Sequence, residues 1–418
     1  METHLADFIR DTTAGREAEA ILRKCVHCGF CLATCPTYQL LGDELDGPRG
    51  RIYLIKQVLE TGAATARTRL HLDRCLTCRA CETTCPSGVQ YSRLLDIGRE
   101  LVEARVPRRG MDRLTRAVLR YFLPRRWLFD PALRVGQMLR PLLPAGLRAR
   151  VPERRDPGTR PAPRHARRMV MLAGCVQPAM LPGVNAAAAR VFDRIGISLV
   201  EAQGRNGAGC CGALRFHLND VAGARDDARR NIDAWWPLLE AGCESIVMTA
   251  SGCGVQVRDY AHLLADDPRY AAKAARVALL TRDVAEVLAA EKAALLDCRR
   301  ASAAAAGASP RLVAFHAPCT LQHGQQIRGT VEDLLSAAGF ELTAVADAHL
   351  CCGSAGTYSV LQPELSTRLR DNKLAALAAG GPEVIASANV GCIAHLQGGS
   401  ATPVRHWIEL IDDSLTVA

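Results

Sequence analysis

Hydrophobic side chains recur every three or four residues in three stretches of the first quarter of the chain. These stretches are residues 14–24, 47–60 and 91–106, and their spacing predicts three amphipathic helices. Pro48 falls near the start of the second helix, where a proline nitrogen needs no hydrogen-bond partner. We therefore expect a helical module over residues 1–106.

From residue 169 onward the pattern changes to short β-rich runs that alternate with helical stretches. The alternation occurs twice, and each copy carries four cysteines in the same order: one after a strand, an adjacent pair, and one after a later strand. Matching cysteines of the two copies lie 139 to 144 residues apart, which indicates an internal duplication. Alternating strands and helices predict a parallel or mixed sheet in each copy, with the cysteines at strand ends, where α/β folds hold their ligands.

An arginine-rich segment separates these two parts. Residues 105–168 contain 18 arginines and four acidic residues, so the segment is strongly basic. Four prolines are expected to divide it into short helical pieces: Pro124, Pro131, Pro141 and Pro144. Residues 151–168 are expected to form an extended linker. Nothing else in the sequence supports nucleic-acid binding. Arginines mixed with Phe122, Trp127 and many leucines suit a membrane surface or a partner protein, and the sequence favours neither.

Length and composition set the limits of the whole chain. With 418 residues and 49% hydrophobic content, it can form several cores. We expect four parts: a helical domain over 1–106, a basic connector over 107–168, and duplicated domains over 169–297 and 298–418. No apolar run is long enough for a transmembrane helix, and the N-terminus lacks the pattern of a secretory signal peptide. We expect a cytoplasmic protein, peripheral on the inner face of the cell membrane, whose cysteines are not disulfide-bonded.

Two loops carry the strongest chemical signal among the 18 cysteines. The loops are CVHCGFCLATCP, residues 25–36, and CLTCRACETTCP, residues 75–86. Their shared spacing is typical of two-cluster ferredoxins, in which the cysteine before the proline ligates the other cluster. Zinc is the alternative metal, but zinc sites usually take two cysteines from each of two turns. The predicted ligands are Cys25, Cys28, Cys31 and Cys85 for the first [4Fe-4S] cluster, and Cys75, Cys78, Cys81 and Cys35 for the second.

The duplicated copies predict two further metal sites. The first consists of Cys175, Cys210, Cys211 and Cys253, and the second of Cys319, Cys351, Cys352 and Cys392. A glycine follows each adjacent pair and permits an unusual turn. An additional iron-sulfur cluster, zinc and a metal-free thiol cluster all remain open for these sites.

Several residues near these motifs are given ordinary roles. Cys243 and Cys298 fall outside every spacing rule and are expected to be simple thiols. Four histidines close to the cysteines are expected to be hydrogen-bonded rather than ligands: His217, His323, His349 and His395. Residues 207–212, GAGCCG, match the dinucleotide fingerprint G-x-G-x-x-G, but their variable positions include the adjacent cysteines. We therefore expect no nicotinamide or flavin on this chain.

The order of these modules resembles the iron-sulfur subunits of membrane-associated dehydrogenases and of heterodisulfide reductase, whose duplicated domains are called CCG domains. The stretches CVHCGFCLATCPTYQLLGDELDGPRGRIYLIKQVLE, NIDAWWP and HLCCGSAGTYS are similar to the family of glycolate oxidase iron-sulfur subunits. The resemblance covers nearly the whole chain and is weakest over 107–168. Heterodisulfide reductase relatives have a fifth cysteine three residues before the last one, where this chain has Ala250 and Asn389. This departure puts a disulfide-cleaving noncubane cluster in doubt.

The resemblance implies an electron-transfer subunit with no catalytic residue of its own. Partner subunits that carry FAD would oxidise glycolate to glyoxylate, with D-lactate as a second substrate, and electrons would pass through this chain toward a quinone at the membrane. Three alternatives stay open. They are a thiol-disulfide oxidoreductase subunit, the iron-sulfur subunit of a glycerol-3-phosphate or lactate dehydrogenase, and a non-enzymatic scaffold.

Overall fold

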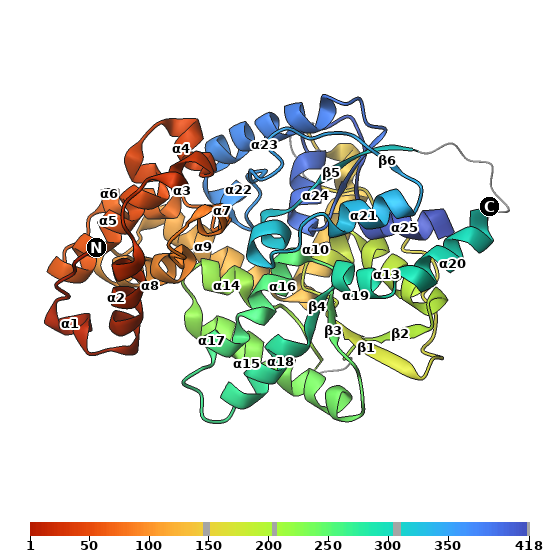
Figure 1. Ribbon diagram of the computed structural model, residues 1–418, viewed down its shortest axis with the longest axis horizontal. Helices are drawn as coiled ribbons and strands as arrows, with labels where there is room; N and C mark the ends of the chain where they lie inside the picture. The colour runs from red at the N-terminus through yellow and green to blue at the C-terminus, as the bar shows by residue number, and fades with distance from the viewer. Residues whose placement is uncertain (145–150, 203–206, 304–310, 416–418) are drawn as a thin grey trace.

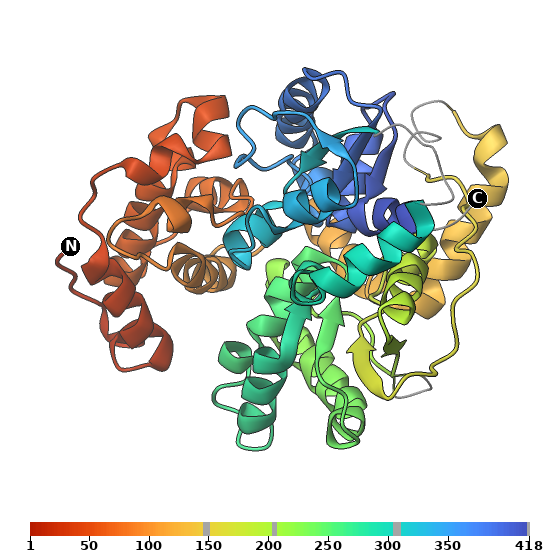
Figure 2. The same cartoon turned by 45° about the vertical axis from the view of Figure 1, so that its right-hand side comes forward.

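A helical N-terminal body lies at one end of the molecule, beside two α/β bodies that pack against each other (Figure 1). This computed structural model describes residues 1–144, 151–202, 207–303 and 311–415. The N-terminus lies on the helical body, at the end of the molecule away from the two α/β bodies (Figure 2).

The N-terminal body is built around three of its helices. It contains α1 (Asp7–Arg10), α2 (Thr13–Lys24), α3 (Phe30–Ala33), α4 (Pro36–Leu41), η1 (Glu44–Asp46), α5 (Pro48–Thr61), α6 (Ala66–Asp73), α7 (Ala80–Thr84) and α8 (Tyr91–Arg105). The three predicted helices are confirmed as α2, α5 and α8, which bury Ile21, Ile55 and Leu94 in one core. Thr12 begins α2 because its hydroxyl oxygen accepts a hydrogen bond from the Gly15 backbone nitrogen at 3.0 Å.

Two sheets of identical topology follow. The first contains β1 (Arg167–Met171), β2 (Ile197–Val200), β3 (Ile246–Met248) and β4 (Thr281–Asp283), in the order β2-β1-β3-β4. The second contains β5 (Leu312–His316), β6 (Glu341–Leu342), β7 (Val384–Ser387) and β8 (Val404–His406), in the order β6-β5-β7-β8. Every strand pair is parallel. The predicted duplication and α/β class are therefore confirmed.

Helices cover both sheets and join the two copies. The first copy has α12 (Gln177–Met180), α13 (Pro182–Arg194), α14 (Ala213–His217), α15 (Val221–Glu240), α16 (Ser251–Arg258), α17 (Tyr260–Leu263), α18 (Ala271–Leu280), α19 (Val284–Ala290) and α20 (Lys292–Ala303). The second has η3 (Thr320–Gly324), α21 (Thr330–Ala337), α22 (Tyr358–Leu361), α23 (Pro363–Ala378), α24 (Val390–Gln397) and α25 (Trp407–Leu415). One hydrophobic core contains Phe192 of the first copy and Trp407 of the second. The two copies therefore form a single packed unit.

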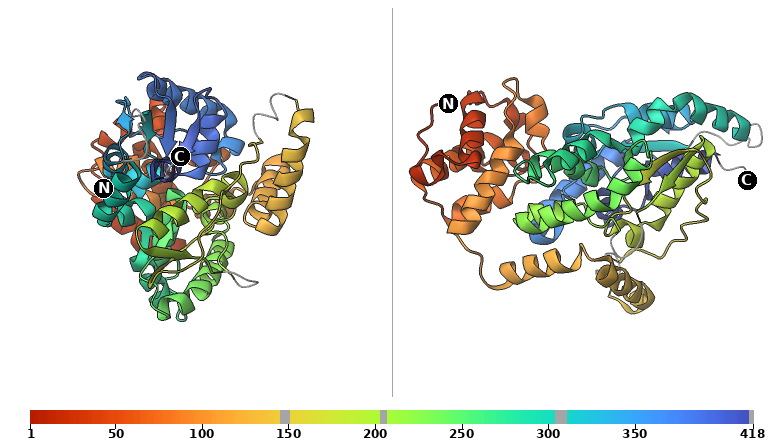
Figure 3. Two further views of the ribbon diagram at one scale, coloured as in Figure 1. Left: turned by 90° about the vertical axis from the view of Figure 1, so that its right-hand side faces the viewer. Right: turned by 90° about the horizontal axis from the view of Figure 1, so that it is seen from below.

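The basic connector forms an arm on the outside of the molecule, which we define as α9 (Gly110–Phe122), α10 (Arg126–Leu139) and η2 (Arg140–Leu142). These helices lie along one side, away from the sheets (Figure 3). Pro124 separates α9 from α10, as predicted. The prediction of a break at Pro131 is wrong, because this residue lies inside α10. The proline removes one backbone hydrogen bond, and solvent can satisfy the freed carbonyl on this exposed helix.

The second half of the connector has no regular secondary structure over residues 151–166, in agreement with that part of the predicted linker. The prediction that the linker reaches residue 168 is wrong, because Arg167 and Arg168 pair with β2 as the start of β1. The part of the predicted helical region at residues 145–150 lies outside the described residues. None of the described helices combines the length and the apolar character that crossing a bilayer requires.

Candidate metal centres

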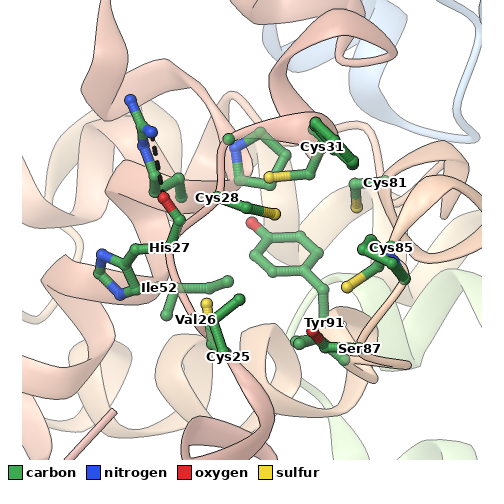
Figure 4. A pocket seen from close by; sticks show the side chains of 16 residues that line it. Cys25, Val26, His27, Cys28, Cys31, Ile52, Cys81, Cys85, Ser87 and Tyr91 are labelled. Carbon is green, nitrogen blue, oxygen red and sulfur yellow. Dashed lines mark hydrogen bonds between the residues drawn. The ribbon is translucent and has the colours of Figure 1, made fainter.

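The two N-terminal loops together line two cavities. The first cavity is lined by Cys25, Cys28, Cys31, Cys81 and Cys85. Figure 4 shows these side chains around one space that also holds the ring of Tyr91. The second cavity is lined by Cys35, Cys75, Cys78 and Cys81. Each cavity thus receives the last cysteine of the opposite loop, Cys85 or Cys35, together with cysteines of its own loop, and Cys81 lines both cavities.

The backbone of the two loops bends at the same positions. The second residue after the first cysteine is left-handed in both loops, with φ of 55° at His27 and 54° at Thr77. The residue after the second cysteine is also left-handed, with φ of 86° at Gly29 and 60° at Arg79. Three of these four residues carry a side chain that disfavours this conformation. The shared loop shape is therefore imposed by its surroundings and turns successive cysteines toward one space.

Burial makes these thiols costly to ionise without a cation. It raises the pKa of Cys31 to about 11, and the neighbouring Cys25 adds to the rise. Burial also raises the pKa of Cys25, and those of Cys78 and Cys81 well above their usual range. A metal centre would supply the positive charge that several close thiolates need. Four soft sulfur donors at each of two cavities fit iron-sulfur clusters.

The first CCG site gathers its four cysteines at the carboxyl ends of β1, β2 and β3. The thiols of Cys175 and Cys211 both hydrogen-bond to Cys210, and these bonds lower the pKa of Cys210 well below its usual value. Cys211 also contacts Cys253, which lies in α16. The four predicted residues are therefore linked in the order Cys175, Cys210, Cys211 and Cys253, each in contact with the next.

The second CCG site repeats this arrangement. The sulfur atoms of Cys319 and Cys351 are 3.9 Å apart, and the thiol of Cys352 contacts that of Cys392. The amide of Gly353 donates to the Cys351 sulfur at 3.4 Å, as the amide of Gly212 does to Cys210 at 3.5 Å.

The glycine after each cysteine pair is required by the backbone. Gly212 has a φ of 89° and Gly353 a φ of 86°. A side chain at Gly353 would approach the backbone oxygen of Ser366 to 2.7 Å. The expected unusual turn is therefore present in both copies, and in each it points one backbone N–H at a sulfur atom.

The N-terminal body is docked so that the second cavity adjoins the second CCG site. One hydrophobic cluster contains Leu76 and Cys351, with Cys78 and Cys319 packed against it. A negative charge at Cys319 would raise the pKa of Cys78, after the larger effect of burial. The core around Cys211 in the first copy contains none of the described residues of the N-terminal body, because all of its members lie between residues 170 and 277.

Polar contacts hold this domain junction. Asp259 of the first copy accepts hydrogen bonds from Arg79 at 2.6 Å and from Arg93 at 2.8 Å. Thr83 bonds to His323 at 3.0 Å, and the Tyr358 hydroxyl donates to the Arg74 carbonyl oxygen at 3.2 Å. The N-terminal body therefore contacts both copies.

Most of the histidines and cysteines that were not expected to bind metal have hydrogen-bond or packing partners in the protein. His323 bonds to Thr83 and to the His349 carbonyl oxygen, and His395 bonds to Ser366. The Cys298 thiol donates to the Arg194 carbonyl oxygen at 3.3 Å. Cys243 is buried in the core of the first copy.

One residue of the second CCG site was missed by the sequence reasoning. A ring nitrogen of His316 and the sulfur atoms of Cys352 and Cys392 all lie within 4.8 Å of one another. The signal that could have found it is its position three residues before Cys319, at the end of a predicted strand.

The fold and the cysteine sets define the class of protein. Residues 21–89 match the family model of the 4Fe-4S dicluster domain, and residues 169–258 and 313–397 match that of the Cysteine-rich domain. The chain is therefore an iron-sulfur protein with a dicluster domain and two cysteine-rich domains.

Comparison with whole proteins defines the family. The chain is 53% identical to the glycolate oxidase iron-sulfur subunit of Escherichia coli (strain K12), over 99% of both chains. It is 32% identical to the probable glycolate oxidase iron-sulfur subunit of Bacillus subtilis (strain 168), over 92% of this chain and 90% of the relative. A lactate utilization protein A of Bacillus velezensis is 28% identical over 54% of this chain. The chain belongs to the family of glycolate oxidase iron-sulfur subunits.

Proposed function

We propose that this chain is the electron-transfer subunit of a flavin-dependent dehydrogenase that oxidises glycolate to glyoxylate. A partner subunit would hold FAD and the substrate, and this chain would carry electrons from that flavin toward a membrane quinone. The observation that carries the proposal is the position of Cys78. It packs, as Cys319 does, against the hydrophobic cluster that contains Cys351, so two thiol sets lie side by side. Relatives named for glycolate oxidase support the substrate.

The cysteines have separate roles in this proposal. Cys25, Cys28, Cys31 and Cys85 hold one [4Fe-4S] cluster, and Cys75, Cys78, Cys81 and Cys35 hold the other. When bound, such clusters accept and release single electrons. The two CCG sets, Cys175, Cys210, Cys211 and Cys253, and Cys319, Cys351, Cys352 and Cys392, each hold an additional cluster or zinc. These sites lie in three proposed domains, which cover residues 1–106, 169–297 and 298–418. The connector over 107–168 joins the first domain to the second.

The arm is the part of this chain proposed to meet the membrane. Nine of the 16 large hydrophobic side chains that are exposed among the described residues lie between Met111 and Leu142. On α9 they are Met111, Leu114, Val118 and Tyr121, which share one helical face. Because this apolar face lies in a strongly basic segment, it complements an anionic lipid surface better than a neutral one.

The electron-transfer role is tested by Cys28→Ser in the assembled complex. Cys28 is an exposed ligand of the first proposed cluster, and its loss is expected to abolish glycolate-dependent reduction of an artificial dye acceptor. Cys298→Ser is the matched control, because Cys298 lies outside every site and serine can keep the hydrogen bond to Arg194. Full turnover in Cys28→Ser would contradict the proposal.

Metal analysis of the anaerobically purified chain tests the ligand sets. About eight irons per chain would mean that only the two N-terminal clusters are filled, and clearly more would place iron in a CCG site. Zinc in the absence of extra iron would assign the CCG sites to zinc.

A related dehydrogenase is the second candidate. Several relatives are named lactate utilization protein A, and these cover about half of this chain. Activity of the complex with lactate and none with glycolate would favour this candidate. Disulfide reduction by the isolated chain would instead favour a thiol-disulfide oxidoreductase.

A further inference from the structure

The second CCG site has a nitrogen atom among its sulfur atoms. His316 is the last residue of β5, and only 2% of its surface is exposed. One of its ring nitrogens lies within 4.8 Å of the sulfur atoms of Cys352 and Cys392, which are themselves within that distance of each other. This spacing is short enough for one metal ion to contact all three atoms.

The hydrogen bonds of His316 leave one ring nitrogen free. Its Nδ1 lies 2.9 Å from the hydroxyl oxygen of Ser387, on the neighbouring strand β7. Its Nε2 is buried and has no hydrogen-bond partner among the described residues. A buried polar atom without a partner is costly, so its presence needs an explanation. Metal-binding histidines commonly have this arrangement, in which one nitrogen is held by a hydrogen bond and the other faces the metal.

We propose that His316 is a ligand of the metal centre in the second CCG site, together with Cys319, Cys351, Cys352 and Cys392. This inference rests on the proposed binding of metal by those cysteines. The Nδ1–H group donates to Ser387 and fixes the ring, and Nε2 binds the metal. A site of sulfur donors with one imidazole suits iron or zinc, and excludes hard cations such as magnesium.

The two CCG copies differ at this position. The residue three before the first cysteine is His316 in the second copy and Leu172 in the first. Leu172 is 3% exposed and packs in the core of the first copy. This difference between the copies matters for electron transfer, because the site with the histidine is the one that adjoins Cys78. A neutral imidazole leaves a site less negative than another thiolate would, which favours acceptance of an electron.

Asn389 does not supply the additional donor. Its side-chain amide nitrogen donates toward the Cys392 sulfur at 3.4 Å, so it presents hydrogen atoms rather than a lone pair to the site. His316 is therefore the nitrogen ligand that the geometry favours.

The test uses the full-length chain, purified anaerobically from cells that are grown with 15N-labelled histidine. If the site holds paramagnetic iron, pulsed EPR measures the hyperfine coupling of a histidine nitrogen. If it holds zinc, X-ray absorption at the zinc edge counts nitrogen and sulfur neighbours. We expect one histidine nitrogen at the metal in the unmodified chain, and none in His316→Gln, whose amide can still bond to Ser387.

Two controls separate the possible failures. His395→Gln changes a histidine of the same domain that bonds to Ser366, and it should leave the nitrogen signal unchanged. Cys352→Ser should lower the metal content of the chain. If Cys352→Ser has no effect on metal content, the proposed metal site itself is wrong. If it lowers the metal content while the unmodified chain has only sulfur ligands, or His316→Gln keeps the nitrogen signal, the assignment of His316 is wrong.

Discussion

At the scale of single residues, Arg51 places a buried positive charge beside the second N-terminal cavity. It is 1% exposed and lines that cavity together with Cys35 and Cys75. Its guanidinium donates to the His71 carbonyl oxygen at 2.7 Å and lies 3.5 Å from the Asp46 carboxylate. Asp46 is fully buried and holds this charge in place. A fixed positive charge near a redox centre stabilises the reduced form, which is the more negative one, and so raises the reduction potential of that centre.

We therefore predict that Arg51→Met lowers the reduction potential of one of the two N-terminal clusters, by roughly 50–100 mV. Arg51→Lys keeps the charge and should change the potential much less. Because Arg51→Met leaves a buried carboxylate with fewer partners, we also expect a loss of about 3 kcal/mol in stability. Potentiometric EPR titration of the purified chain measures the shift. Equal potentials in Arg51→Met and the unmodified chain would show that this charge does not act on a cluster.

At the scale of elements, the sequence predicted the regular parts of the fold correctly. Periodic hydrophobic residues marked α2, α5 and α8, and repeated cysteine spacing marked two sheets of one topology. Each of these features is determined by a short stretch of sequence, so a local pattern of residues is enough to predict it. The left-handed residues His27 and Thr77 could not be predicted, because residues other than glycine seldom adopt that conformation.

The arm is the element whose prediction can be tested most directly. The triple variant Leu114→Ser, Val118→Ser and Trp127→Ser removes three exposed apolar side chains from α9 and α10. We expect the unmodified chain to bind vesicles that contain phosphatidylglycerol more strongly than neutral phosphatidylcholine vesicles, and to release them at high salt. The variant should bind roughly a hundredfold less, because burial of each of the three side chains contributes ~1 kcal/mol or more.

Vesicle co-sedimentation measures this binding. Leu279→Ser with Val360→Ser is the control, since both residues are exposed and lie outside the arm. Vesicle binding that is unaffected by the triple variant would contradict a membrane role. If the variant instead fails to co-purify with the proposed flavin subunits, the arm is a protein-docking surface.

At the scale of the whole molecule, the docking of the domains could not be read from the sequence. Cysteine spacing predicted which residues would gather within each site, but not that Cys78 would lie beside Cys319 of the second copy. This junction depends on pairs such as Arg79 and Asp259, which are 180 residues apart in the chain. Such pairs produce no repeating pattern in the sequence that would predict their contact. His316 was missed for a related reason: it stands three residues before Cys319, but only the folded sheet brings its ring close to Cys352 and Cys392, which are 36 and 76 residues away in the chain.

The two copies therefore have equivalent folds and unequal positions, and this inequality is testable with a matched pair of variants. Cys210 and Cys351 are each the first cysteine of the adjacent pair, both are buried, and each accepts a hydrogen bond from the following glycine. Serine at either position should perturb its own copy to a similar degree. Because only Cys351 shares a hydrophobic cluster with Leu76 and Cys78, we predict that Cys351→Ser slows electron transfer to a quinone analogue to near background, whereas Cys210→Ser retains most of it.

Stopped-flow measurement of cluster reoxidation in the assembled complex, after reduction through glycolate, would measure both rates. Iron content and circular dichroism should be compared between the variants, so that a difference in folding is not mistaken for a difference in the electron path. If the two variants are slowed equally while both retain the N-terminal clusters, the path does not depend on the second CCG site more than on the first, and the predicted inequality is wrong. A larger effect of Cys210→Ser would mean that electrons leave the chain through the first copy. The contact between Cys78 and the second site would then serve only to hold the domains together.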